Sequence, residues 1–201
     1  IVRRAGDVIP EVVTSIPERR SGSEIEWSLD KRCPCGDFDI VYVKDEKVPR
    51  CSGSYDCKIS KKEMLIYFAS KSGLDIEGLG RETVETLIAN KLVKNFEDFY
   101  SLTYEELISL PQWKEKKTKN LLEAIEKSKN SEQEKLLPAL GIRYVGKQTS
   151  KLLVNTFGSI KNIFDASSDE INKIHGISES VSNSLIEWYS CLLYTSDAAD
   201  D

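Results

Sequence analysis

The segment IEGLGRETV, residues 76–84, is the most informative about the fold, because it recurs in altered form three times farther along the chain. The matching windows are LPQWKEKKT (110–118), IRYVGKQTS (142–150) and IHGISESVS (174–182). Their fifth positions are 80, 114, 146 and 178, so the copies follow one another at steps of 34, 32 and 32 residues. Helical periodicity flanks the windows, as in 82–92 and 148–157. This internal repeat predicts four tandem helix–hairpin–helix units.

The first window contains the turn Gly78-Leu79-Gly80. Glycine adopts positive φ without a Cβ clash, so such a turn can present its backbone N–H groups outward. The helix that follows begins with unsatisfied amides and with the positive end of its dipole. Together these form a small anion site suited to a DNA phosphate. Phosphate contacts carry no base information, so we expect binding that is indifferent to sequence.

The four copies are unequal. The third has Tyr144 before Gly146, the fourth has Gly176 before Ser178, and the second has no glycine. A non-glycine residue in a left-handed turn costs about 1–2 kcal/mol, so the second turn is expected to be strained, differently turned or purely structural. The first and third windows therefore rank highest as phosphate sites. The alternative is that these are ordinary helix connections in which glycine only marks turns.

Four of the five cysteines lie between residues 33 and 57, in a chain with no export signal. Clustering of this kind is typical of metal binding. Four thiolates suit a closed tetrahedral zinc site, so we expect one structural Zn²⁺, with no open position for catalysis, on Cys33, Cys35, Cys51 and Cys57. The C-x-C spacing of the first pair is narrower than usual, and a lost or degenerate metal site is the alternative. Pro34 and Gly36 favour a knuckle turn there.

Composition narrows the function classes. The 201 residues are 40% hydrophobic and 30% charged, as in a soluble chain of small modules, without a membrane span or signal peptide. The net charge of −5 argues against binding nucleic acid by bulk charge alone. Residues 111–151, however, hold ten Lys or Arg against five Glu. Contact with DNA would be concentrated on such stretches.

The expected organisation is multidomain and mainly α. Residues 1–14 read as the end of a β-structure, 15–32 as a polar linker, 33–60 as the cysteine module and 61–189 as the helical repeat domain. Residues 190–201 match nothing upstream and are expected to be a non-native tail. The chain opens without Met, from which we expect it to begin inside a longer protein.

Three stretches carry a family resemblance: RRAGDVIP (3–10), LDIEGLG (74–80) and ALGIRYVG (139–146). With the order of strand end, four-cysteine finger and four repeats, they make residues 1–189 resemble the NAD-dependent DNA ligases of bacteria. The resemblance implies that 1–14 end an OB-fold that contacts DNA beside the nick. It also implies that the finger joins this barrel to a helical domain lying on the minor-groove side of the duplex.

Members of that family seal a 3′-hydroxyl to a 5′-phosphate through an adenylated lysine, using NAD and a divalent metal, Mg²⁺. The Lys-x-Asp-Gly motif of that chemistry is absent from this sequence. The resemblance thus implies a fragment of the C-terminal half that clamps nicked duplex DNA and has no catalytic residue, with NAD and Mg²⁺ bound outside it. It further implies a monomer in the bacterial cytoplasm, whose partners are nicked DNA and the remaining ligase domains of its parent chain.

The candidate DNA contacts lie on the strand end and the hairpins. They are Arg3, Arg4, Gly78, Gly80, Arg81, Lys116, Lys117, Arg143, Gly146, Lys147 and Gly176. A stand-alone zinc and helix–hairpin–helix DNA-repair adaptor is the rival interpretation. A helical protein-interaction module whose hairpins touch no DNA is a third.

Overall fold

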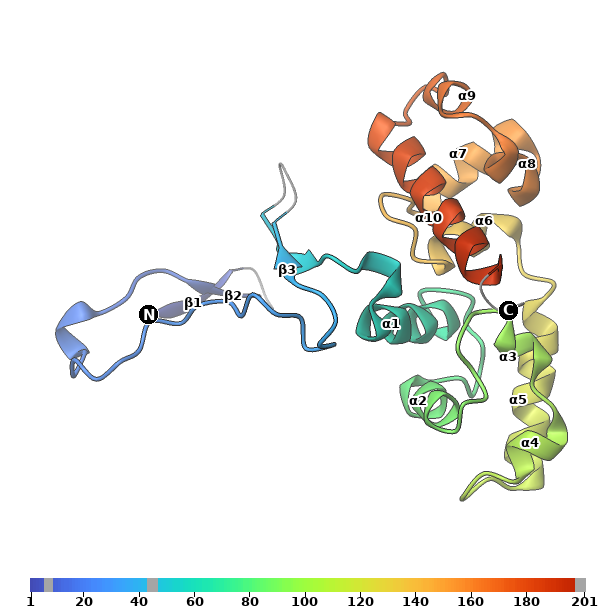
Figure 1. Ribbon diagram of the computed structural model, residues 1–201, viewed down its shortest axis with the longest axis horizontal. Helices are drawn as coiled ribbons and strands as arrows, with labels where there is room; N and C mark the ends of the chain where they lie inside the picture. The colour runs from blue at the N-terminus through green and yellow to red at the C-terminus, as the bar shows by residue number, and fades with distance from the viewer. Residues whose placement is uncertain (6–8, 43–46, 198–201) are drawn as a thin grey trace.

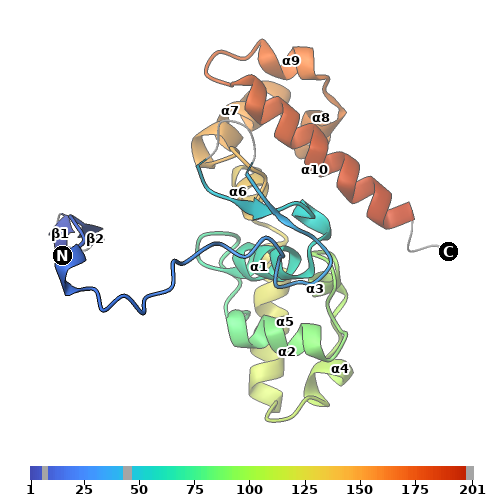
Figure 2. The ribbon, with the colours of Figure 1, turned by 60° about the vertical axis from the view of Figure 1, so that its left-hand side comes forward.

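The computed structural model describes residues 1–5, 9–42 and 47–197. Strands β1 (Val2–Ala5) and β2 (Ile9–Val12) pair antiparallel, with Val2 opposite Val12 and Arg3 opposite Glu11. This pair stands apart from the helices, at the end of an extended segment that contains the 3₁₀ turn η1 (Pro17–Arg19) (Figures 1 and 2). The strand end and the linker expected from the sequence thus have different local structures.

The cysteine module follows as a second small sheet. Strand β3 (Ile40–Val41) pairs antiparallel with β4 (Arg50–Cys51), and the 3₁₀ turn η2 (Ser54–Asp56) leads into the first helix. Its hydrophobic cluster is small and consists of three cysteines with Phe38, Ile40 and Cys51 at its edge. An ideal Cβ on Gly53 would lie 2.2 Å from the Phe38 ring, so this glycine makes room for the ring.

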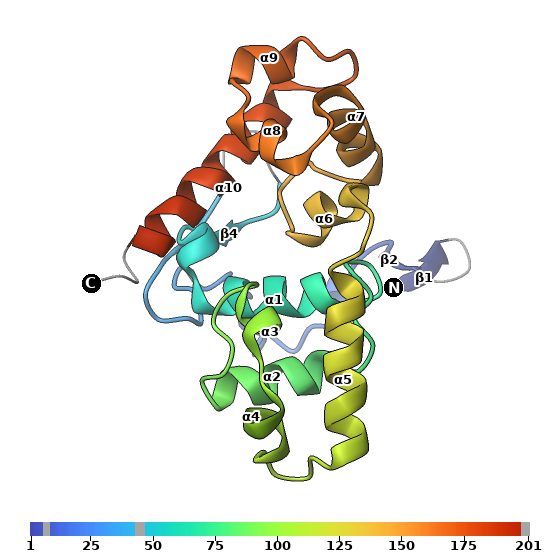
Figure 3. The ribbon, with the colours of Figure 1, turned by 90° about the vertical axis from the view of Figure 1, so that its right-hand side faces the viewer.

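The rest of the described chain is helical, as the three- and four-residue periodicity predicts. The helices are α1 (Lys58–Ala69), α2 (Arg81–Ala89), α3 (Asp98–Ser101), α4 (Tyr104–Ile108), α5 (Glu115–Ser128), α6 (Gln133–Ala139), α7 (Lys147–Phe157), α8 (Ile160–Asp165), α9 (Ser168–Asn172) and α10 (Glu179–Asp197). Helix α1 lies between a lobe of α2–α5 and a lobe of α6–α10 (Figure 3). Within the described residues, no helix is both long and apolar enough to cross a bilayer.

One hydrophobic cluster runs through both lobes. Phe68, Val84 and Leu121 lie in three different helices and are almost fully buried in this cluster. Phe68 contacts the rings of Phe96 and Phe99, with centroids 4.8 and 6.1 Å away. These contacts join α1 to the chain around α3. The helices are therefore stabilised by packing against one another as well as by their own hydrogen bonds.

The C-terminal helix crosses the boundary expected at residue 189. Helix α10 (Glu179–Asp197) is continuous through it, and residues 198–201 of the expected tail lie outside the described residues. Trp188 of α10 is buried and its ring lies 5.5 Å from that of Phe164 in α8. The part of the helix that precedes residue 190 is therefore packed into the core.

Replacing Gly73 by alanine should destabilise the helical body by about 1–3 kcal/mol. An added Cβ would lie 2.3 Å from the carbonyl oxygen of Phe68 and 2.5 Å from that of Tyr67, and these backbone atoms cannot rotate away. Gly80→Ala is the matched control, because a Cβ there meets nothing within 4 Å. Urea unfolding of both variants measures the difference. A Gly73→Ala chain as stable as the Gly80→Ala chain would contradict the packing at α1.

Candidate nucleic-acid interface and metal centre

The four repeated windows share one backbone turn. Their third residues, Gly78, Gln112, Tyr144 and Gly176, all have positive φ, of 85°, 67°, 61° and 92°. In each window the fourth residue donates its N–H to the carbonyl of the first, over 3.1, 3.2, 3.1 and 3.1 Å. A positive φ at the third position with this hydrogen bond is the signature of a type II turn. The repeat in the sequence is thus a repeat of conformation.

The second turn resolves one of the alternatives left by the sequence. Gln112 adopts the same left-handed conformation as the glycines, so this turn is strained and is not differently turned. Tyr144 does the same in the third turn, and its side chain remains half exposed, at 51%. The turn therefore forms without a glycine at this position.

The fifth residue of each window has another role. Gly80, Lys114 and Gly146 are the N-caps of α2, α5 and α7, and all three have extended backbones, with φ of −74°, −130° and −89°. The predicted need for positive φ therefore applies to the first glycine of the motif and is wrong for the second. A Cβ on Gly80 or Gly146 would meet nothing within 4 Å, so packing among the described residues does not require glycine at either position.

These helix starts leave backbone donors available. None of the N-caps of α2, α5 and α7 forms a side-chain capping hydrogen bond. By contrast, Thr103 and Ser167 close capping boxes at α4 and α9. The first amides of an uncapped helix need an acceptor from solvent or from a ligand. The turns at α2, α5 and α7 thus combine free donors with the positive helix end.

Apolar side chains hold each turn against the core. The first and fourth residues of the first three windows are buried, and those of the fourth window are half buried: Ile76 and Leu79, Leu110 and Trp113, Ile142 and Val145, and Ile174 and Ile177. The third and fifth residues are exposed in all four windows. The turns therefore anchor inward and present their backbone outward.

The turns associate in pairs. A Cβ on Gly78 would contact the Leu121 side chain of α5 at 3.6 Å, and one on Gly176 would contact Leu152 of α7 at 3.7 Å. The first turn thus packs on the helix that follows the second turn, and the fourth packs on the helix that follows the third. Sequence spacing alone does not indicate this pairing.

A groove of about 1260 Å³ lies between the first turn and α5. Gly78 and the candidate contacts Lys116 and Lys117 line it together. Lys114, Asn120 and Lys127 also line it, although the sequence reasoning did not select them. Helical spacing could have revealed Asn120 and Lys127, because they lie four and eleven residues after Lys116 and so share its face of the helix. Asp75, Glu77 and Glu123 contribute acidic groups to the same wall.

The other candidate DNA contacts are distributed over separate places. Arg3 and Arg4 are exposed on β1, away from the helical body, and Arg3 pairs with Glu11 at 2.9 Å (Figure 1). Arg143 lies over the Tyr144 ring, 4.9 Å from its centroid. Lys147 is exposed at the first position of α7.

Two further candidate cations have partners within the protein. Lys117 lies 4.1 Å above the Trp113 ring, while Arg81 makes two 2.7 Å contacts with the Glu63 carboxylate. Glu63 is 18 residues earlier on α1, and no sequence signal indicated this contact.

The structure brings the four predicted zinc ligands together. The Sγ atoms of Cys33, Cys35, Cys51 and Cys57 all lie within 4.8 Å of one another. Cys33 Sγ and Cys57 Sγ are 3.9 Å apart. Four sulfurs about 2.3 Å from one tetrahedral zinc ion would lie roughly 3.8 Å apart, so the donor set fits this metal. Both members of the narrow C-x-C pair take part.

The expected knuckle turn explains how that pair fits. Gly36 donates its N–H to the Cys33 carbonyl at 2.9 Å and has φ of 86°, and Cys33 donates to the Phe38 carbonyl at 2.9 Å. Pro34 occupies the second position of this turn, where its fixed φ is favourable. The tight turn brings both thiols to one point although a single residue separates them.

The thiols differ in acidity. Burial raises the pKa of Cys51 to about 12. Burial also acts to raise the pKa of Cys57, but hydrogen bonds from Ser60, Cys51 and Ile59 outweigh it and lower this pKa to about 6. Cys57 is the N-cap of α1, where backbone amides favour a thiolate. A bound cation would favour the thiolate form of Cys51, whose pKa is raised in its absence.

The comparisons with known proteins bear on the repeated turns. A model of the helix-hairpin-helix motif matches residues 135–191, which contain the third and fourth turns. DNA ligases of Anoxybacillus flavithermus and Geobacter sulfurreducens are 38% and 41% identical to the chain over 190 residues. Each match covers 94% of this chain, which spans 28% of the length of these relatives. Over nearly its whole length, the chain is therefore similar to a part of the DNA ligases of bacteria, and it contains a helix-hairpin-helix motif.

Proposed function

We propose that this chain is the DNA-gripping portion of an NAD-dependent ligase that seals nicks between a 3′-hydroxyl and a 5′-phosphate. The observation that carries the proposal is the repeated type II turn, which leads into exposed and uncapped helix starts in a relative of DNA ligases. In this proposal the four turns are tandem helix–hairpin–helix units. Residues 1–14 are the end of an OB-fold that brings Arg3 and Arg4 to DNA beside the nick.

The proposed contact is made mainly by the backbone. Phosphate oxygens accept hydrogen bonds from the first amides of α2 and α7, where Gly80 and Gly146 let the sugar-phosphate chain approach closely. Lys116, Lys117 and Lys147 add positive charge, and each phosphate they neutralise releases counterions. Because no base edge is read, the grip is independent of sequence. Such a clamp suits an enzyme whose nicks occur anywhere in a genome.

The proposed Zn²⁺ is structural. The four thiolates would close its coordination shell, so it would order residues 33–57 without taking part in catalysis. When bound, the ion would supply the stabilisation that a large apolar core would otherwise give, because this segment has only a small hydrophobic cluster. The folded module would then join the OB-fold portion to α1. The proposed role is therefore to couple two DNA-contacting parts.

The proposed division of labour leaves the nucleotide chemistry to the rest of the parent chain. The sequence contains no Lys-x-Asp-Gly motif. NAD and Mg²⁺ would be used by other ligase domains in the same polypeptide, in a monomer of the bacterial cytoplasm. This chain by itself would hold nicked duplex DNA and would not seal it.

A two-part assay tests the proposal. The purified chain should bind nicked duplexes of unrelated sequence with equal affinity, and the logarithm of the binding constant should fall linearly with the logarithm of the salt concentration. Incubation with NAD, Mg²⁺ and nicked DNA should give neither sealing nor covalent adenylate. An adenylated lysine on this chain would overturn the division of labour. Absence of salt-dependent duplex binding would favour a protein-interaction module instead.

A further inference from the structure

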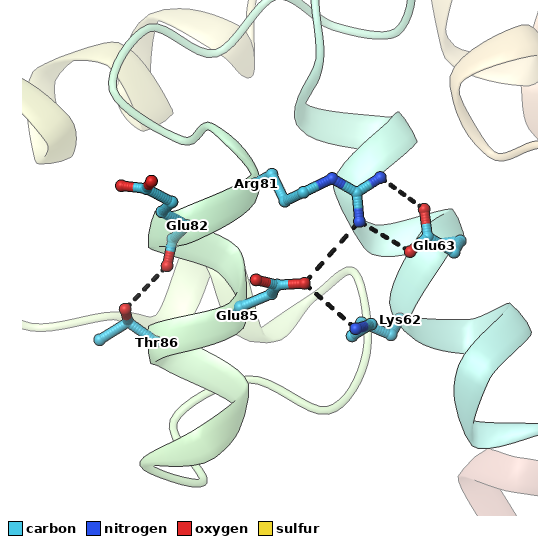
Figure 4. Close-up of polar contacts among 6 residues, drawn as sticks. All are labelled: Lys62, Glu63, Arg81, Glu82, Glu85 and Thr86. Atoms are coloured by element: carbon cyan, nitrogen blue, oxygen red, sulfur yellow. Dashed lines mark hydrogen bonds and ion pairs between the residues drawn. The ribbon is translucent and has the colours of Figure 1, made fainter. Parts of the chain in front are cut away.

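A network of four charged side chains joins α1 to the start of α2 (Figure 4). Arg81 makes two parallel contacts with Glu63, from Nη1 to Oε1 and from Nη2 to Oε2, each 2.7 Å long. Its Nη1 also lies 3.7 Å from Glu85 Oε1, which accepts a 3.1 Å hydrogen bond from Lys62 Nζ. The two cations and two anions of this network balance in charge.

The geometry of the network is directional. A paired contact between a guanidinium and a carboxylate fixes angle as well as distance, which a lysine could not do. Arg81 is the first residue of α2 and directly follows the bare N-cap Gly80, whereas Glu63 belongs to the middle of α1. The contact therefore holds the start of α2 on α1, whose buried face packs in the core.

The equivalent position in the third turn is different. Lys147 directly follows Gly146 at the start of α7, and it forms no ion pair with any residue that the structure describes. The two turns ranked highest for phosphate binding thus have different cations beside them. One cation is held by another helix and the other extends into solvent.

We infer that Arg81 is a positioning residue of the first turn, which aims the Gly80 turn and the amides of α2 at a phosphate by holding α2 on Glu63. Phosphate at this turn is then bound by backbone donors, while Lys147 provides the charge contact at the third turn. The hydrogen bonds and charge of Arg81 lower the pKa of Glu63, consistent with a carboxylate that stays ionised and paired at neutral pH. The inference rests on the proposed function.

The substitution Glu63→Gln should change the affinity for DNA in opposite directions, depending on whether Arg81 binds phosphate directly or positions α2. If Arg81 contacts DNA, Glu63 competes with phosphate, so Glu63→Gln would tighten binding, and Arg81→Gln would reduce the salt slope by about 0.9. If Arg81 positions α2, both substitutions weaken binding by a similar factor, about fivefold, and the salt slope stays unchanged. The double variant should then bind no worse than either single variant, because one interaction is lost in all three.

The experiment titrates a fluorescent nicked duplex with the whole chain and its Arg81→Gln, Glu63→Gln and double variants at several salt concentrations. Glu126→Gln is the matched control, because it breaks a 2.6 Å pair between α5 and its own C-cap residue, Lys129, and joins no second helix. Hydrogen exchange without DNA adds a second readout, in which the α2 amides of both single variants should exchange faster. Tighter binding by Glu63→Gln, or additive losses, would overturn the inference alone. Failure of the unaltered chain to bind any duplex would overturn the proposed function as well.

Discussion

Replacing Gly80 or Gly146 by valine is expected to weaken duplex binding by about tenfold to a hundredfold, the range for losing a hydrogen bond to a charged group. The fold should persist, because both residues have extended backbones and a Cβ would meet no atom within 4 Å. A β-branched side chain there would instead occupy the space through which a phosphate reaches the amides. Fluorescence titration of a nicked duplex measures the loss, and urea unfolding checks the stability.

Lys114→Val is the matched comparison. Lys114 is the N-cap of α5 and already has a Cβ and a Cγ, so the change adds only one methyl group beside the backbone, whereas the glycine variants add a whole side chain. We expect a smaller loss of affinity, mainly through charge, together with a shallower salt dependence. Equal losses at Lys114 and at the two glycines would mean that the ranking of the turns is wrong.

Cys57→Ser is expected to abolish zinc binding, from one ion per chain to near zero by elemental analysis of freshly reduced protein. Cys57 is almost fully buried among the other three thiols, and a serine hydroxyl is a poor zinc ligand at this site. Since this module has little apolar core, residues 33–57 should become open to proteolysis. The helical body should remain folded, because its hydrophobic cluster is separate.

Cys191→Ser controls for the loss of a thiol. Cys191 lies on α10 and does not belong to the four-cysteine group, so its replacement should leave the zinc content at one ion per chain. If the unaltered chain contained no zinc, the proposed structural ion would be refuted. If Cys57→Ser retained a full equivalent, the ligand set would be wrong.

Much of the local structure was predictable because it depends on neighbours in the chain. The helical spacing of Leu65, Phe68 and Ala69 indicates a buried face, and all three are buried in α1. The CPCG stretch favours a tight turn because proline fixes φ and glycine accepts positive φ, and the turn places Cys33 and Cys35 in one thiol group. The helix–hairpin–helix motif of residues 135–191 also agrees with the prediction from the repeat.

The role of the second glycine in each motif could not be predicted from residue type. A glycine at the fifth position of the motif, such as Gly80, favours positive φ. The residues at this position, Gly80, Lys114 and Gly146, are instead N-caps with an extended backbone. Conversely, Gln112 is left-handed although its type disfavours this. Buried neighbours on both sides, Leu110 and Trp113, hold the turn in place, and their packing outweighs a local preference of about 1–2 kcal/mol.

The order of residues is enough to predict the periodic elements of this protein: the helices, the cysteine group and four turns at intervals of 34, 32 and 32 residues. These features depend on local spacing, which the order of residues contains directly. Three contacts become visible only in the folded chain: the first turn packs on Leu121, the fourth packs on Leu152, and Arg81 pairs with Glu63. Such contacts join side chains on different helices, whose directions are set by the shared core, and local sequence preferences contain no information about those directions.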